Sequence, residues 1–251
     1  MDWSKAKNIL IAALLVTNLI LIGAIYGSMD HPDGSDREDI RENTILLLRE
    51  HRIYVEEDVI PEKNQSLPVL SVRYRTVDQE KADLVMKEWT EPLSGNTADE
   101  AYCDAADKLL RQAEINAASF VHRSVQRMDQ TISVIYGVEY KGYSLDNSRL
   151  IVTFRDGAPV AIGTSWAEPV TMGKNRKQVM TASTALIKFM SELETSQAEE
   201  DREDVFVDEI RLVYWLEGYT ENGGVSEDTA VPYWCIEYNG DQRAYISAYE
   251  Q

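Results

Sequence analysis

The side chains that could do chemistry are few and far apart. The three histidines, His31, His51 and His122, are distant from one another in the sequence, and none belongs to an HExxH pair. Only the fold could bring them together as metal ligands, and we expect no metal site. The sequence also contains no GxSxG, Walker A or Rossmann glycine pattern. We therefore expect no catalytic residues, no cofactor and no enzymatic activity.

Carboxylates and thiols leave two alternatives open. The chain has 43 Asp and Glu residues, so counting leaves a glycosidase-type carboxylate pair open. However, no acidic residue stands alone in an apolar segment, and the clusters 56–58 and 199–204 are typical of solvated charge. Cys103 and Cys235 are far apart and outside any CxxC motif. Whether they form a disulfide stays open, because that bond requires a specific geometry.

Aromatic residues near the C-terminus could either fill a sheet or bind a sugar. Their types fit the preferences of β-strands. We therefore expect them to pack in the core or on the face of a sheet, in preference to forming a sugar-binding platform. They are Tyr233, Trp234, Tyr238, Tyr245 and Tyr249.

The charge of the chain excludes one class of partner. The net charge is −18 and the pI is near 4.6. Nucleic acid binding needs a Lys/Arg surface that displaces counterions, so we expect no nucleic acid partner. The acidity is typical of a solvated surface, although an acidic binding patch would have the same composition.

The N-terminal segment has the length and composition of a membrane span. Residues 8–27 read NILIAALLVTNLILIGAIYG and carry no charge. Twenty residues in a helix rise about 30 Å, the thickness of the hydrocarbon core. A cleavable signal peptide has a shorter apolar stretch of about 7–15 residues and a small-residue cleavage site, which 24–28 match poorly. We therefore expect an uncleaved transmembrane helix at 8–27, in the lipid bilayer.

Charge on either side of this segment predicts its orientation. Lys5 and Lys7 precede it, and acidic residues dominate the stretch that follows it. The positive flank stays in the cytoplasm. We therefore expect a cytoplasmic N-terminus at 1–7 and an extracytoplasmic body at 28–251, in a single-pass protein of the cell membrane.

Several residues of the segment could contact a partner helix. Asn18 lies near the middle of the span, where an unpaired amide is costly. Gly23 and Gly27 form a small-xxx-small pair, which lets another helix approach closely. Trp3 lies at the cytoplasmic end, where interfacial aromatic residues concentrate. A helix that only anchors the protein also tolerates these residues, so both interpretations stay open.

The body has the pattern of an α+β protein. A linker at 28–35 precedes a helix at 36–51, a strand pattern at 67–77 and a helix at 97–118 that starts with a capping-box spacing. Strand patterns follow, and another helix is predicted at 176–193.

The order of helix and then strands occurs twice. Turns at Asp156-Gly157 and Asn239-Gly240 lie at similar places in the two series, with their glycines 83 residues apart. We therefore predict two related units, each a helix on an antiparallel sheet, at 36–170 and 171–251.

The opening Met1-Asp2-Trp3-Ser4-Lys5, followed by the apolar run with Asn18, resembles the YycI (WalI) family. The resemblance continues in the helix at 36–51, the break at Pro61 and the strand at 67–70. It ends with 231–236 and 245–248, a closing hairpin that is also similar to PepSY-type units.

This resemblance implies an accessory regulator of the WalK (YycG) sensor histidine kinase. It implies an N-terminal transmembrane helix and an extracytoplasmic α+β domain without chemistry of its own. It also implies association with the kinase and with a YycH-like sister protein through membrane helices. Two other functions remain open: a PepSY-like module that restrains a secreted peptidase or binds cell-wall polymer, and a hydrolase with a carboxylate site that the sequence does not reveal.

Overall fold

The computed structural model describes residues 34–62, 65–91, 93–94, 97–116, 120, 122–163, 165–196, 203–217 and 227–249. The predicted span at 8–27 lies outside these residues, and so do the candidate contact residues Trp3, Asn18, Gly23 and Gly27. Among the described residues, no helix combines the length and the apolar composition that crossing a membrane requires.

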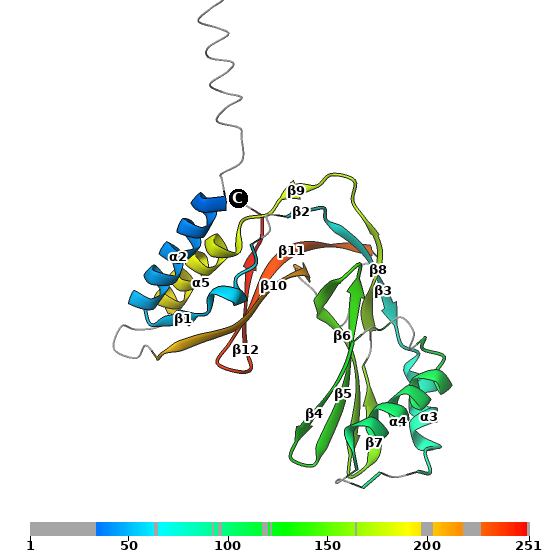
Figure 1. The fold of residues 1–251 in the computed structure, drawn as a ribbon. Coiled ribbons are helices and arrows are strands. Elements are labelled where there is room, and N and C mark those ends of the chain that lie inside the picture. Colours follow the sequence, from blue (N-terminus) through cyan, green and yellow to red (C-terminus); the bar gives the residue numbers. More distant parts are fainter. Residues whose placement is uncertain are drawn as a thin grey trace, which may run out of the picture.

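The described residues form a mixed α+β fold with four α-helices and a ten-stranded sheet (Figure 1). The helices are α2 (Gly34–Glu50), α3 (Gln79–Lys87), α4 (Asp99–Gln112) and α5 (Ala182–Ser196), with a 3-10 turn η1 (Glu57–Val59) after the first. The strands of the first half are β1 (Ile53–Val55), β2 (Ser66–Leu67), β3 (Leu70–Thr76), β4 (His122–Met128), β5 (Thr131–Tyr140) and β6 (Tyr143–Arg155). The remaining strands are β7 (Ala158–Ile162), β8 (Ser165–Met172), β9 (Lys177–Gln178), β10 (Val205–Leu216), β11 (Glu227–Tyr238) and β12 (Gln242–Ser247).

The large sheet has two arms, which are joined where β10 meets β6 and where β11 pairs with β3. Its strand order is β4-β5-β6-β10-β11-β3-β8, with β1 beside β10, β12 beside β11 and β7 beside β6. Strands β6 and β10 are parallel and share a single register pair, Leu145 with Tyr214. The arm of β4, β5 and β6 therefore diverges from the arm of β10, β11 and β12 on either side of this pair (Figure 1).

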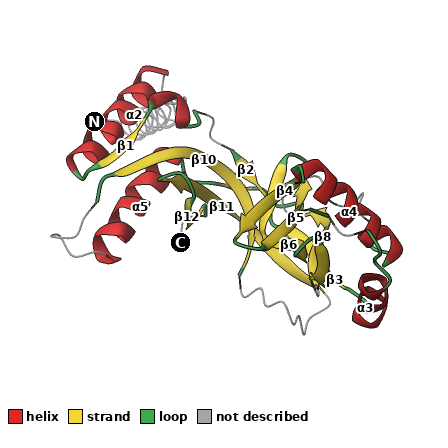
Figure 2. Cartoon of the chain, turned by 90° about the horizontal axis from the view of Figure 1, so that it is seen from below, coloured by secondary structure: helices red, strands yellow, loops and turns green. Residues whose placement is uncertain are grey.

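A separate pair of helices packs against each arm of the sheet. In the first core, α3 and α4 cover strands of the β3–β8 and β5–β6 region, with Tyr102, Leu109 and Phe154 fully buried. In the second core, α2 and α5 pack on β1 and on β10 to β12. Figure 2 shows the two helix pairs at opposite ends of the molecule. The second core combines residues 48–67 with 179–248, so it draws on both sides of the predicted boundary between 170 and 171.

The two predicted turns are confirmed, and each closes a hairpin. Asp156 and Gly157 have φ angles of 51° and 77°, and Asn239 and Gly240 have φ angles of 49° and 85°. Two successive positive φ angles define the turn type that matches the twist of a two-residue hairpin. The hairpins are β6–β7 and β11–β12.

The ends of two predicted helices are wrong. The helix predicted at 97–118 is α4, which begins at Asp99 after Ala98, so the expected capping box does not form. It ends at Gln112 because Glu114 takes a φ of 59° and the Ile115 N–H donates to the Leu110 carbonyl, a Schellman-type stop.

The helix predicted at 176–193 starts only at Ala182. Lys177 and Gln178 are extended because they pair with β2, and the Met180 N–H donates to the Ala248 carbonyl. Backbone hydrogen bonds to other segments therefore take the place of the first predicted helical turns.

Candidate functional site

The sheet arm of β10, β11 and β12 has two chemically different faces. Side chains alternate along each strand, so Ile210, Leu212, Trp234 and Ile236 enter the second core under α2 and α5. The residues between them point to the opposite face. The register places Arg211 beside Cys235 and Cys235 beside Tyr245 on that face, with Glu237 beside Arg243.

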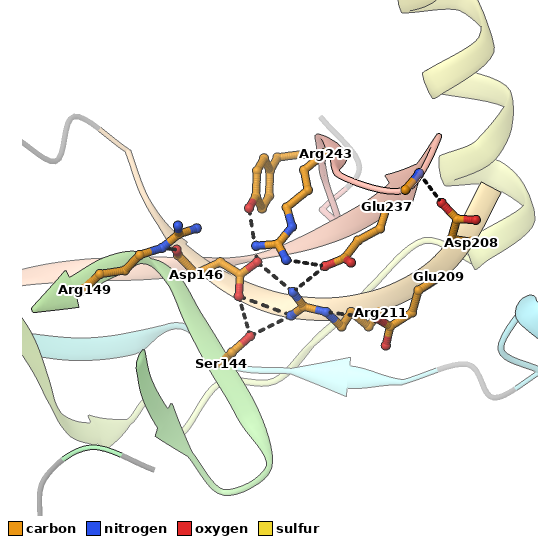
Figure 3. Close-up of polar contacts among 10 residues, drawn as sticks. Ser144, Asp146, Arg149, Asp208, Glu209, Arg211, Glu237 and Arg243 are labelled. Atoms are coloured by element: carbon orange, nitrogen blue, oxygen red, sulfur yellow. Dashed lines mark hydrogen bonds and ion pairs between the residues drawn. The ribbon is translucent and has the colours of Figure 1, made fainter. Parts of the chain in front are cut away.

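A network of ion pairs occupies this second face (Figure 3). Arg211 lies 3.0 Å from Asp146 on β6 and 3.1 Å from Glu237 on β11. Arg243 lies 3.0 Å from Glu237. The guanidinium of Arg211 therefore links the two arms of the sheet, close to the junction at Leu145 and Tyr214.

Asp146 is the most buried member of the network, with a side chain 7% exposed. Ser144 donates a hydrogen bond of 2.6 Å to Asp146, and the Tyr245 hydroxyl donates one of 3.1 Å. Burial alone would raise the pKa of Asp146, but the hydrogen bonds and the charge of Arg211 outweigh it, so this pKa lies below its ordinary value. Asp146 is therefore an ionised hydrogen-bond acceptor near neutral pH and cannot act as a general acid there.

The neighbouring groups are held in their protonated forms. Burial, reinforced by the charges of Asp146 and Glu237 and only partly opposed by Arg211, raises the pKa of the Cys235 thiol to about 12. Burial and the negative charge of Asp146 raise the pKa of Tyr245 above its ordinary value. A protonated, fully buried thiol is a poor nucleophile, so Cys235 does not supply nucleophilic chemistry to this face.

Two adjoining cavities form a groove over the network. Their volumes are about 700 Å³ and about 610 Å³. Both are lined by the same five residues, which places the ion-pair network in the middle of a continuous groove between the two arms. The shared residues are Gln126, Asp146, Arg149, Glu237 and Arg243.

The two ends of the groove differ. At one end lie Trp215 and Tyr245, whose ring centroids are 4.1 Å apart. The ring of Tyr233 lies 6.2 Å from that of Trp215, so Trp215 on β10 has aromatic neighbours on both β11 and β12. The other end is formed by β4, β5 and β6, with polar and small residues that include Ser124, Gly137 and Glu139.

The structure separates most residues that the sequence marked as chemical. His51, just after α2, contacts Glu194 on α5 at 2.6 Å and lines neither cavity of the groove, and His122 belongs to β4. Within the described ranges, no group of three or more His, Cys, Asp or Glu residues is arranged to hold a metal ion. Cys103 on α4 and Cys235 on β11 are thiols in different parts of the fold and do not form a disulfide with each other.

The expected packing of the C-terminal aromatic residues is confirmed in part by their burial. Trp234 is 2% exposed and donates to the Met180 carbonyl, and Tyr238 packs against Phe189. Tyr233 and Tyr245 lie on the open face of the sheet, which is the other packing that the sequence predicts.

The sequence interpretation missed Trp215, Asp146 and Arg211. The signal that could have found Arg211 is a lone arginine between apolar residues in a predicted strand, Ile210-Arg211-Leu212. In a strand with one buried face, that pattern indicates a charge on the other face.

Comparisons with known proteins add little to this description. No family model matches the chain, and no curated protein matches it. Among solved structures, the chain is similar to an uncharacterized protein from Eubacterium rectale ATCC 33656, determined by crystallography at 1.45 Å resolution. The two are 14% identical, the match covers 88% of this chain and 81% of the other, and the TM-score is 0.38. A likeness at this level carries no argument about fold or function.

Proposed function

We propose that this protein is a membrane-anchored, non-catalytic regulator of a WalK (YycG)-type sensor histidine kinase, in the manner of the YycI (WalI) family. Its N-terminus lies in the cytoplasm, residues 8–27 span the cell membrane, and the body is extracytoplasmic. The observation that carries this proposal is the short linker between the predicted span and α2, a helix that packs in the second core.

Six residues, 28–33, separate the end of the predicted span from Gly34, the first residue of α2. A fully extended stretch of that length reaches roughly 20 Å. The body is therefore confined close to the membrane surface, and a movement of the span acts on α2 through a short connection.

Helix α2 is fixed to the body at its far end. Leu48 is fully buried in the second core, and Thr44 is 4% exposed. His51 contacts Glu194 on α5. The side chain of Arg52 lies 2.8 Å from that of Asp204, the residue just before β10. A displacement of the span would thus be passed to α5 and β10 without a flexible joint inside α2, which suits a protein that couples a membrane helix to an external domain.

The body contains two related units in this proposal. Helix α4 precedes β5, β6 and β7, and helix α5 precedes β10, β11 and β12. In the first series β6 pairs with β5 and with β7. In the second series β11 pairs with β10 and with β12. The repeated order supports duplicated helix-and-sheet units, of which the second is PepSY-like.

The partners in this proposal are proteins and lipid. Trp3, Asn18, Gly23 and Gly27 would contact the helices of the kinase and of a YycH-like sister protein in the bilayer. Regulation needs no cofactor, metal or nucleic acid. In the groove, Asp146 does not serve as a general acid near neutral pH and the buried thiol of Cys235 does not serve as a nucleophile, which fits a site that binds.

Copurification from membranes tests this function. The tagged full-length chain is extracted in mild detergent, captured, and its partners are identified by mass spectrometry. A matched control carries Gly23→Leu and Gly27→Leu, which hold partner helices apart without altering the apolar character of the span. We expect a histidine kinase to copurify with the unchanged chain. The control should recover much less of that kinase. Recovery of a secreted peptidase without any kinase would instead favour the PepSY-like binding module.

A further inference from the structure

We propose that the groove between the two sheet arms binds a neutral oligosaccharide, with Trp215 as its stacking platform. This ligand class goes beyond the regulation of a kinase, since it gives the external body a small-molecule site of its own. The proposal follows from the aromatic end of the groove, the polar network in its middle and its continuous shape.

The aromatic end offers flat apolar surface beside polar groups. Trp215 is half-buried on the open face, and its ring centroid lies 4.1 Å from that of Tyr245 and 6.2 Å from that of Tyr233. These neighbours limit the orientations of the indole. The face of an aromatic ring is electronegative, so it attracts the weakly positive C–H groups that cover one side of a sugar ring.

The polar middle of the groove is already ordered. The carboxylate of Asp146 is held by Arg211, Ser144 and Tyr245, and that of Glu237 by Arg211 and Arg243. Side chains held in this way lose little further freedom when a ligand binds. Hydroxyl and amide groups of a ligand can donate to such carboxylate oxygens and accept from the guanidinium N–H groups without displacing the ion pairs.

The charges of the groove favour a neutral ligand. Asp146 and Glu237 are matched by Arg211 and Arg243. The other charged residues of the lining are Arg149 against Glu139, Glu209 and Asp241, so the groove as a whole is slightly negative. A cationic ligand would have to compete with Arg211 for Asp146. An anionic ligand would be repelled by a chain of net charge −18. Uncharged hydroxyl and acetamido groups neither compete with Arg211 nor are repelled by the net charge.

The shape of the groove favours an oligomer over a single ring. The cavity that contains Trp215 continues past Asp146 and Arg149 into the cavity that reaches Ser124 and Gly137. A chain of sugar rings can place one ring on Trp215 and the next rings over the polar network. Ligand sites commonly combine such apolar surface with a few placed polar groups.

Titration of the full-length chain with tetra-N-acetylchitotetraose tests the proposal. The chain is kept in a detergent without a sugar headgroup, so that the detergent does not compete. We expect saturable binding by calorimetry together with a change in tryptophan fluorescence. Trp215→Ala should weaken binding at least about tenfold, as for a central aromatic contact, and Trp215→Phe should weaken it less. The matched control is Trp89→Ala, a half-buried tryptophan beside the first core that should leave binding unchanged.

Three results would overturn the proposal. The first is absence of saturable binding by the unchanged chain. The second is equal binding by Trp215→Ala with an intact near-ultraviolet dichroism spectrum, or equal weakening by Trp89→Ala. The third is preference for a sulfated tetrasaccharide or for an uncharged extended tetrapeptide over the neutral sugar. None of these results bears on copurification of the kinase, so the two proposals fail separately.

Discussion

Replacing Arg211 with methionine removes the guanidinium that joins the two arms of the sheet. Methionine keeps much of the side-chain length and leaves Asp146 and Glu237 in place. Glu237 retains its contact with Arg243, whereas Asp146 retains only the hydroxyl donors of Ser144 and Tyr245 among the contacts described above. The change therefore leaves a nearly buried carboxylate without its cation.

The expected cost follows from the exposure of these groups. Removing one partner of a fully buried ion pair costs about 3–5 kcal/mol. The side chain of Asp146 is 7% exposed and that of Arg211 is 28% exposed, so water screens this pair in part. We therefore expect the free energy of unfolding to fall by about 2–4 kcal/mol at neutral pH. For a body of this size that corresponds to a midpoint lower by roughly 4–16 °C.

The loss should depend on pH in a defined direction. In the unchanged protein the pKa of folded Asp146 is below its unfolded value, so this group contributes stability above the unfolded pKa and loses it as pH falls through the folded pKa. Without Arg211, burial is no longer outweighed and the folded pKa rises. Protonation then relieves the penalty, so the difference between variant and unchanged protein should shrink as the pH falls from 7 toward 4.

Urea unfolding of the body from residue 34 at several pH values measures these differences. The control is Arg73→Met, which removes an ion pair with Glu227 whose side chains are 45% and 67% exposed. Such exposed pairs contribute at most about 1 kcal/mol. Asp146→Asn in the Arg211→Met background should restore stability. An Arg211→Met loss no larger than the control, or one that grows at low pH, would refute this reasoning.

Three further results are expected. A Cβ at Gly157 would lie 1.6 Å from the Leu93 carbonyl oxygen, whereas one at Gly240 meets nothing within 4 Å. In thermal unfolding, Gly157→Ala should therefore cost several times the roughly 1 kcal/mol of Gly240→Ala, and equal costs would disprove the close approach. Cys103 and Cys235 are buried, and burial raises the pKa of Cys235 to about 12. Neither thiol should therefore react with a thiol reagent at pH 8 until the protein is unfolded. Rapid labelling of the native protein would contradict this. Protease added to intact cells should digest the body and spare an uncleaved N-terminus, and a mature protein that begins near residue 28 would exclude the anchor.

Local patterns in the sequence predict much of the fold. The helical spacing at 36–51 corresponds to α2, and the alternation at 67–77 corresponds to β2 and β3. The turns at Asp156-Gly157 and Asn239-Gly240 are correct because two adjacent residues of these types readily take positive φ angles. These features depend on neighbours in the chain, which the sequence displays directly.

Features that depend on distant segments were not predictable in the same way. The start of α5 is delayed because 177–180 hydrogen-bond to β2 and to the C-terminal segment. The groove depends on the junction of β6 and β10, where Leu145 pairs with Tyr214 and Asn147 hydrogen-bonds to Leu216, and this junction brings Asp146 on one arm to Arg211 on the other. Nothing in either local pattern specifies that these two residues, 65 positions apart, form an ion pair.

Exchange of the predicted span tests the central claim most directly. Residues 8–27 are replaced by a poly-leucine helix of equal length, and Asn18→Leu is made separately. A reporter of the kinase's target genes is measured in cells, with protein levels checked in membrane fractions. An interhelical hydrogen bond from Asn contributes roughly 0.5–2 kcal/mol, which shifts a two-state equilibrium by about twofold to thirtyfold. The account predicts altered reporter output from both variants at normal membrane levels. Normal output from the poly-leucine chain would contradict it and would show that the span is only a tether.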